Sequence, residues 1–571
     1  MPTLDWIGKK AVVNHHKEVP FHLLKCDPDL SVGDPESGNL LVQGDNLLAL
    51  KALLPYYAGQ VKCIYIDPPY NTGVDERDEA NKRTGWIYSD NVNSPEIRDW
   101  LNRVVGAEAE DLTRHDKWLC MMLPRLNLLW KFLREDGVIF VSIDEVEYAS
   151  LRLLLDEIFG VRNRVGTIVW KNATDNNPTN IASEHEYVLC YAKDKSKLEP
   201  VWKSATIAVK QKLVDIGEAF AEKHKDQEER QREYSKWFRK NKAFLWPFDR
   251  YKFIDDGGVY TGSQSVHNPG KEGYRYDILH PVTGKPCMQP LMGYRFPPET
   301  AERLLAEERL IFGEDETKII ELKVYAKDYR AKLSSLFELD GRTGTNEIKA
   351  IFPENKRPFD FPKPTALLEE LISFTTKGND IVLDSFAGSG TTGHAVLKLN
   401  QADLNSRRFV LVEMKNLIAE NITSQRLKRV VLGYENEKGD FIAGVGDGFK
   451  YCTLGETLFD SIGQISKSVS FLGFAHFVYF KETGSPLPDE VSGKSPRIGI
   501  YNGTAIYLLY NGILGDKTPQ GGNALTRSVL AELPPHDGPK VIYGTSCRVG
   551  SARLKQENII FRQIPYELKV D

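Results

Sequence analysis

The sequence predicts an α/β fold built on a parallel sheet. Short apolar runs typical of buried strands, such as VKCIYI at Val61–Ile66, alternate with longer amphipathic segments typical of helices. The same alternation returns with ALLEELISF and IVLD in the stretch 366–384. This rhythm indicates βαβ units, in which a crossover helix returns the chain so that the next strand runs parallel to the last.

Composition divides the chain into four segments. Over 195–342 the alternation gives way to charged helix and aromatic-rich sequence punctuated by Gly and Pro, so we expect an inserted module. Residues 1–194 and 343–437 would then be the two halves of one sheet domain. After the polar, Gly-rich stretch Glu435–Lys450, β-rich runs predict a small α+β domain within 438–571.

The bulk composition is that of a soluble globular protein. Of 571 residues, 41 % are hydrophobic and 27 % charged, and no apolar run approaches membrane-spanning length. The first residues resemble neither a secretory signal nor a transit peptide, so we expect a cytoplasmic protein. Seven cysteines occur singly, which suggests neither a disulfide framework nor a Cys-based zinc site, and we expect no metal. The formal charge of −5 does not decide nucleic-acid binding, because clusters matter more than the sum.

A glycine motif predicts a cofactor site. In IVLDSFAGSGTTGHAV, the residues Gly388, Gly390 and Gly393 form G-x-G-x-x-G between a strand and a helix, which lets a ligand approach the backbone. Glu413 ends the next strand, where an acid can bind both hydroxyls of a ribose. Together they indicate an adenosine-containing cofactor. No Lys precedes the two threonines after Gly390, which disfavours a triphosphate P-loop.

A second motif, DPPY at Asp67–Tyr70, directly follows the strand VKCIYI. Each motif has an ordinary explanation: Asp67 can be a turn former, and the glycines can serve a tight connection without a ligand. Both motifs, however, stand at the carboxyl ends of predicted parallel strands, where open α/β sheets bind ligands. Coincidence is therefore the weaker explanation.

DPPY together with FAGSGTT resembles the S-adenosylmethionine-dependent DNA amino-methyltransferases. DPPY precedes the glycine loop with an insertion between them, as in the permuted β class of that family. Further segments, among them GDNLLALKALL, FLREDGVIFVSID, HPVTGKP and FPKP, are similar to the modification subunits of type III restriction-modification systems. The resemblance implies a circularly permuted, Rossmann-like methyltransferase domain with an inserted target-recognition domain. The C-terminal domain would serve dimerisation or partner binding.

The catalytic residues that the resemblance implies are Asp67, Pro68, Pro69 and Tyr70. The exocyclic amine of adenine is a poor nucleophile, and the Asp67 carboxylate and the Pro68 carbonyl can each accept one of its N–H groups. Prolines fix φ and leave carbonyls without a competing local N–H. Tyr70 would stack on a base flipped out of the duplex.

The cofactor residues that the resemblance implies are Asp45, Lys363, Thr365, Asp384, Phe386, Ala387, Gly388, Ser389, Gly390, Thr391, Thr392 and Glu413. Asp45 can equally be the N-cap of a helix over NLLALKALL. Lys363 and Thr365 can equally mark a helix start beside proline.

DNA contacts are expected in the inserted module, at Lys236, Arg239, Lys240 and Lys242. These cations are interleaved with aromatic residues in YSKWFRKNKAFLW, so that basic groups can meet phosphates while rings stack. At helical spacing the rings can equally form a core. Residues 71–73 and 85–101 are expected to form a loop over the base pocket, although their Asn, Asp and Ser content equally fits an ordinary surface loop. His185 in SEHEYVLCY is not expected to be catalytic.

The sequence therefore favours a methyltransferase acting on adenine N6 in double-stranded DNA. Cytosine N4 is the nearest alternative, because the same cradle holds either amine. A DNA-reading subunit that mainly carries a helicase-nuclease partner, a dinucleotide-dependent oxidoreductase, and an RNA or protein methyltransferase are further alternatives. The intact DPPY opposes lost catalysis, and DPPY has no place in an oxidoreductase. The resemblance also implies a homodimer and a restriction partner.

Overall fold

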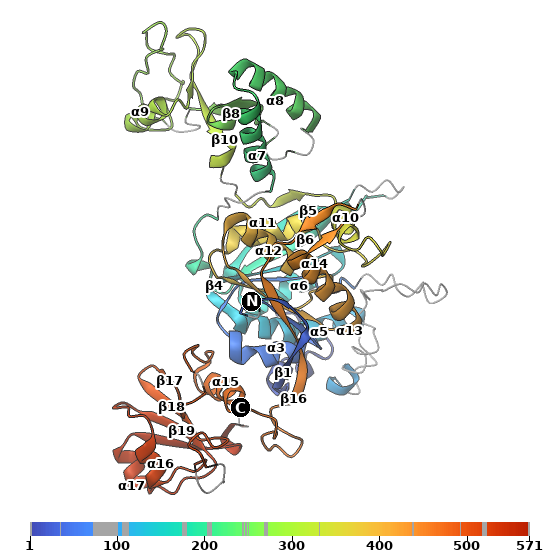
Figure 1. Cartoon of the computed structure of the whole chain (residues 1–571), viewed down its shortest axis with the longest axis vertical. Helices are drawn as coiled ribbons and strands as arrows, with labels where there is room; N and C mark the ends of the chain where they lie inside the picture. The colour runs from blue at the N-terminus through green and yellow to red at the C-terminus, as the bar shows by residue number, and fades with distance from the viewer. Residues whose placement is uncertain are drawn as a thin grey trace. The chain divides into compact units, whose positions relative to one another are not determined.

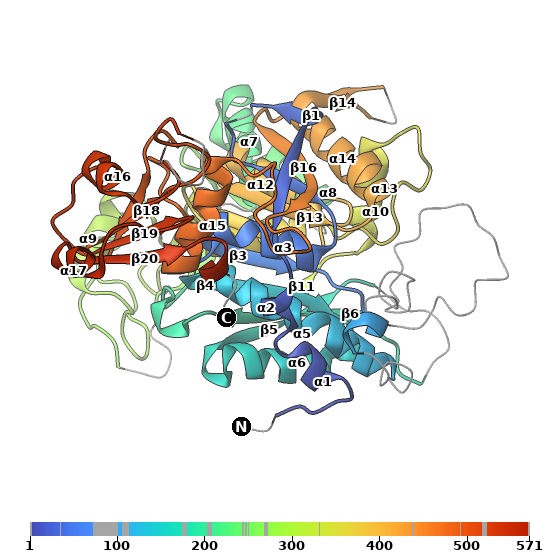
Figure 2. The same cartoon turned by 90° about the horizontal axis from the view of Figure 1, so that it is seen from below.

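In the computed structural model the chain divides into two compact units, residues 1–200 with 334–571, and residues 201–333 (Figures 1 and 2). The second unit lies inside the range 195–342 expected for the insertion. The structure describes residues 3–34, 36–71, 101–105, 113–173, 180–202, 208–241, 245, 248, 250–267, 272–329, 332–436, 439–491, 493–516 and 522–568.

The larger unit is built on a mixed sheet with the strand order β1-β16-β2-β13-β12-β3-β4-β6-β5-β11. These strands are β1 (His22–Gly33), β2 (Leu40–Gln43), β3 (Val61–Ile66), β4 (Leu133–Ile143), β5 (Arg164–Lys171), β6 (His185–Ala192), β11 (Leu336–Glu338), β12 (Ile381–Asp384), β13 (Arg408–Glu413) and β16 (Gly448–Thr457). From β16 to β4 neighbouring strands run parallel. β1 and β6 run antiparallel to their neighbours, so the sheet is mixed rather than wholly parallel.

Helices cover both faces of this sheet (Figure 1). They include α3 (Asn46–Tyr57), α5 (Arg114–Phe132), α6 (Glu145–Phe159), α10 (Arg342–Ile351), α11 (Thr365–Thr375), α12 (Thr391–Asp403) and α14 (Ser424–Leu432). Successive side chains of a strand point to opposite faces. Val410 of β13 accordingly lies in the core shared with α3, α5 and α6, while Leu411 lies beside Gly393 of α12. The central strands are apolar on both faces for this reason.

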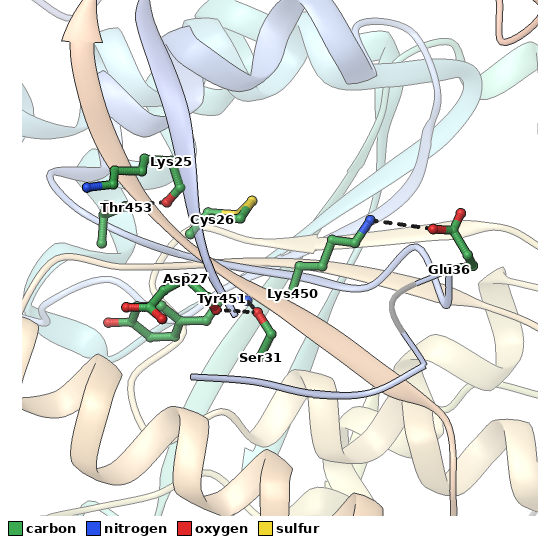
Figure 3. Close-up of a disulfide and its surroundings, with 9 residues drawn as sticks. Lys25, Cys26, Asp27, Ser31, Glu36, Lys450, Tyr451 and Thr453 are labelled. Carbon is green, nitrogen blue, oxygen red and sulfur yellow. Dashed lines mark hydrogen bonds and ion pairs between the residues drawn. A yellow bond between two sulfur atoms is a disulfide. The ribbon is translucent and has the colours of Figure 1, made fainter. Parts of the chain in front are cut away.

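The β1–β16 pair corrects the expected boundary of the C-terminal domain and holds a disulfide. β16 pairs with β2 as well as β1, so the sheet domain extends to Thr457 and the C-terminal domain does not begin at 438. Cys26 and Cys452 lie opposite each other in this ladder and form a disulfide (Figure 3). The sequence analysis did not anticipate this single disulfide, because single cysteines far apart in sequence carry no signal of their pairing.

The C-terminal part of this unit holds a second sheet with the order β17-β18-β19-β20 (Figure 2). Its elements are α15 (Phe471–Thr483), β17 (Arg497–Tyr501), β18 (Thr504–Leu508), α16 (Arg527–Glu532), β19 (Lys540–Gly544), α17 (Ser551–Gln556) and β20 (Ile559–Gln563). α15 packs against this sheet and against α3. Among the described residues, no helix is both long enough and apolar enough to cross a membrane.

The smaller unit combines helices with an antiparallel sheet of order β7-β8-β10-β9. Its elements are α7 (Ala208–Lys223), α8 (Gln227–Asn241), β7 (Phe253–Asp255), β8 (Gly258–Ser265), α9 (Pro298–Ala306), β9 (Leu310–Ile311) and β10 (Glu321–Tyr325). Tyr234 and Phe238 of α8 are buried in one core, and Tyr294 and Phe296 in another. This unit therefore has cores of its own.

Candidate active site

The segment DPPY lies at the carboxyl end of β3, a buried strand near the centre of the sheet. Side-chain hydrogen bonds hold this segment and the residue that follows it. Nε1 of Trp118, a fully buried residue of α5, donates to the carbonyl of Pro69 at 2.7 Å. Nδ2 of Asn71, at φ 63°, donates to Oε1 of the buried Glu147 at 2.6 Å. Trp118 therefore occupies the second proline carbonyl.

Lys363 joins the acid of DPPY to a second carboxylate. Its Nζ lies 3.0 Å from Oδ2 of Asp67 and 3.3 Å from Oε2 of Glu186, and 4.8 Å from the centroid of the Tyr70 ring. The Tyr70 hydroxyl donates to Oε2 of Glu186 at 2.9 Å. Burial raises the pKa of Asp67, and Glu186 adds to this, although the Lys363 ammonium opposes the shift. One cation thus lies between two carboxylates.

Near the two motifs, two buried polar atoms of the DPPY segment and of the loop after β12 have no hydrogen-bond partner among the described residues. They are Oδ1 of Asp67 and Oγ of Ser385, the latter in the loop after β12. Buried polar groups in proteins are nearly always paired, so such atoms suit a ligand that brings its own donors or acceptors. These two atoms are therefore the first places to expect a ligand.

The three glycines of the motif have different structural reasons. Gly388 and Gly390 adopt left-handed conformations, with φ 50° and 79°, which glycine tolerates best. Gly393 instead leaves room for packing, since a Cβ there would lie 2.8 Å from Cδ2 of Leu427. The turn of the predicted cofactor loop thus depends on the first two glycines, and the helix packing depends on the third.

Two buried carboxylates brace this loop. Asp384 accepts from the backbone N–H of Phe386 at 2.9 Å and from Oγ1 of Thr392 at 2.5 Å. Glu413 accepts from the backbone N–H of Gly388 at 2.8 Å. Burial raises the pKa of both carboxyls to about 7. Ala387 donates its N–H to a β13 carbonyl, and Phe386 is buried beside it.

A fully buried arginine that the sequence analysis missed holds the hydroxyls of the loop. Nη1 of Arg426 lies 2.9 Å from Oγ of Ser389 and 2.8 Å from Oγ1 of Thr391, and its Nη2 lies 3.2 Å from Oγ1 of Thr365. Burial lowers the pKa of Arg426 to about 10. In the sequence, Arg426 is one of three cations in the amphipathic run SQRLKRVVL, and nothing there indicates that it contacts the loop.

The remaining predicted cofactor residues also have partners within the chain. Oδ1 of Asp45 accepts from the N–H groups of Leu47 and Leu48 at 2.9 and 3.1 Å, so the N-cap explanation holds in the structure. Thr365 begins α11 and bonds to Glu347. Oγ1 of Thr391 donates to the Lys363 carbonyl at 3.2 Å. Lys363 therefore contacts both motifs, and the structure brings DPPY and the glycine loop together.

Glu186, which the sequence analysis did not single out, lies on the other face of β6 from His185. Side chains alternate along β6, so His185 and Tyr187 share a face that Glu186 does not. Nε2 of His185 lies 2.9 Å from the Tyr187 hydroxyl, which donates to Glu145. A charged residue among the apolar residues of a predicted strand was the available signal. Of residues 71–73 and 85–101, which were expected to form the loop, Asn71 and Leu101 belong to the described part of the chain and the others lie outside it.

The basic residues predicted to contact DNA lie on α8. Lys236, Arg239 and Lys240 are exposed, and Lys236 pairs with Glu233 at 2.7 Å. Lys242 falls outside the described part of the chain. The aromatic partners Trp237 and Phe238 pack with the core of the smaller unit, so the core alternative holds for them. The three described cations are more exposed than these two rings.

DPPY and the glycine loop both lie within the match to one family. The chain belongs to the DNA methylase family N6_N4_Mtase, whose match covers residues 61–438.

Among curated relatives, the chain is 51 % identical over 426 residues to the type III restriction-modification enzyme EcoP15I Mod subunit of Escherichia coli, covering 72 % of this chain and 64 % of that protein. It is 31 % identical over 442 residues to the StyLTI Mod subunit of Salmonella typhimurium, covering 74 % and 60 %. It is 31 % identical over 412 residues to the type II methyltransferase M.KpnI of Klebsiella pneumoniae, covering 69 % and 84 %. The chain thus spans less than two thirds of the length of these two Mod subunits.

Proposed function

We propose that this chain transfers a methyl group from S-adenosylmethionine to the N6 amine of a flipped adenine in double-stranded DNA. The observation that carries the proposal is the junction at Lys363, which contacts Asp67 through its ammonium and the glycine loop through its carbonyl. A group bound at the loop and a base bound at DPPY would meet there. Membership of the DNA methylase family supports the same reaction.

The residues of DPPY would orient the amine. Oδ1 of Asp67 has no partner among the described residues and can accept one N–H, while the Pro68 carbonyl accepts the other. Trp118 already engages the Pro69 carbonyl, which leaves the Pro68 carbonyl as the matching acceptor. Tyr70, whose ring lies under Lys363, would stack on the base.

The loop residues fit the proposed cofactor. S-adenosylmethionine supplies an electrophilic methyl group on a sulfonium. Asp384 and Glu413 are buried acids beside the loop. The Ser385 hydroxyl has no hydrogen-bond partner among the described residues and could bond to the cofactor. Gly388 and Gly390 keep side chains off the loop backbone. Asp45, Lys363 and Thr365 would border this site.

The other parts of the chain would recognise the DNA and bind a partner protein. We place DNA recognition in the smaller unit, with the α8 cations against phosphates. The order of DPPY before the glycine loop supports a circular permutation. The relatives named type III restriction-modification Mod subunits support a modification subunit that joins a restriction partner. We also propose that the chain forms a homodimer. Cytosine N4 remains the alternative target because the cradle would hold either amine.

The test is single-molecule sequencing of genomic DNA from a methylation-free bacterial host that expresses this chain alone. We expect one sequence motif with methylated adenine, absent with Asp67→Ala, while calorimetry shows that this variant still binds S-adenosylmethionine. Methylated cytosine would replace the proposed base. Unmethylated DNA from a host whose folded protein binds the cofactor would refute the proposal.

A further inference from the structure

Glu186 connects three groups of the candidate site. It lies near the start of β6 with its side chain 21 % exposed. Oε2 accepts from the Tyr70 hydroxyl at 2.9 Å and lies 3.3 Å from Nζ of Lys363, and Oε1 accepts from Nδ2 of Asn172 at 2.6 Å. Both carboxylate oxygens of Glu186 therefore have donors. Of these donors, Tyr70 belongs to DPPY and Lys363 contacts Asp67 of DPPY.

We infer that Glu186 is a positioning residue for methyl transfer, which fixes Asp67 through Lys363 and the stacking ring through the Tyr70 hydroxyl. Lys363 then holds Oδ2 of Asp67, and Oδ1 is left to accept an N–H of the target amine. The inference rests on the proposed function and assigns a residue to it that neither motif contains.

The geometry predicts opposite effects of two charge removals. Lys363 is the cation between two carboxylates, so removing its charge leaves Asp67 harder to ionise. Removing the charge of Glu186 leaves Asp67 as the one carboxylate of this pair beside the Lys363 ammonium, and also removes a negative charge near Asp67, so Asp67 becomes easier to ionise. Tyr65 of β3 and Asp384 of β12 also face this cluster, and both substitutions leave them in place.

The first experiment measures the pH profile of single-turnover methylation, on a duplex carrying the motif found by genomic sequencing. We compare wild type with Glu186→Gln, which keeps an acceptor oxygen, and with Lys363→Met. The acid limb should move to lower pH in Glu186→Gln and to higher pH in Lys363→Met, each by about 1 pH unit. Glu184→Gln is the matched control, since Glu184 pairs with Lys171 instead and its loss should leave the limb unmoved.

The second experiment needs no methylation. Acetic anhydride labels lysines according to the fraction of free amine, and peptide mass spectrometry compares Lys363 with Lys398, which pairs with Glu369. Loss of one carboxylate should raise the relative reactivity of Lys363 in Glu186→Gln several-fold. Unchanged reactivity would overturn the contact itself.

The outcomes separate this inference from the proposed function. Opposite shifts of the acid limb, with raised Lys363 labelling, support a positioning role. An active wild type with a Glu186→Gln variant that loses rate equally at every pH would make Glu186 structural only and overturn the inference alone. A folded wild type that methylates no DNA would overturn the proposed function and this inference together.

Discussion

The hydrogen bond from Trp118 to DPPY offers a test by deletion of one donor. Trp118→Phe removes the indole N–H that lies 2.7 Å from the Pro69 carbonyl and keeps an aromatic ring in the core. A buried carbonyl left without a partner costs about 1–3 kcal/mol. The DPPY backbone should therefore open more easily, even though the strand before it stays in the sheet.

Hydrogen exchange measures this opening directly. A change of about 1–3 kcal/mol corresponds to about 5- to 150-fold faster exchange in a peptide that covers Ile66 to Asn71. The methylation rate should fall with it, because the Pro68 carbonyl and Asp67 lose their fixed geometry.

The matched control is Trp130→Phe, the same substitution on the same helix at a side chain that is 37 % exposed. It should leave exchange in this peptide unchanged. Equal exchange and equal activity in the two variants would refute the argument that Trp118 holds the catalytic segment.

Three further predictions concern the loop and α8. Gly390→Ala places a Cβ 3.1 Å from Cγ2 of Thr423 at a φ of 79°, and should weaken S-adenosylmethionine binding measured by calorimetry. The control Gly378→Ala has a similar backbone strain, at a φ of 57°, but open space around the Cβ. It should leave the binding unchanged. Burial raises the pKa of Glu413 from 4.5 to about 7, so between these values the unfolded chain releases its proton first and stability falls as pH rises. The melting temperature of Glu413→Gln, relative to that of wild type, should therefore be higher at pH 8 than at pH 5. An equal difference at the two pH values would contradict the raised pKa of Glu413. Replacing Lys236, Arg239 and Lys240 with Ala should flatten the salt dependence of DNA binding by about 0.9 in slope per lost phosphate contact, and an unchanged slope would move the DNA contact elsewhere.

Local patterns in the sequence predicted much of the site. The apolar run before Asp67 and the glycines after Asp384 each report a strand end or a turn within a few residues. The exposed cations of α8 were also predicted, because charges on a helix face can be recognised from their spacing. The roles of these residues stay predictions, whereas their places at the ends of β3 and β12 and on α8 agree with the structure.

The residues that sequence reasoning missed act through contacts between distant segments. Arg426 is one cation in an amphipathic helix, and nothing near it predicts that its guanidinium reaches Ser389, Thr391 and Thr365. Glu186 is a single acid in a mostly apolar strand, next to His185. Neither belongs to a spacing pattern, because a buried polar network is fixed by packing rather than by period.

The sequence by itself determined the α/β rhythm, the two motifs and their order, since each depends on residues that are close along the chain. Only the tertiary structure decided that β16 completes the large sheet, that Cys26 faces Cys452, and that Lys363 lies between Asp67 and Glu186. The physical reason is that strand order and side-chain burial set which remote residues meet, and a periodic pattern records only which face of its own element a residue occupies.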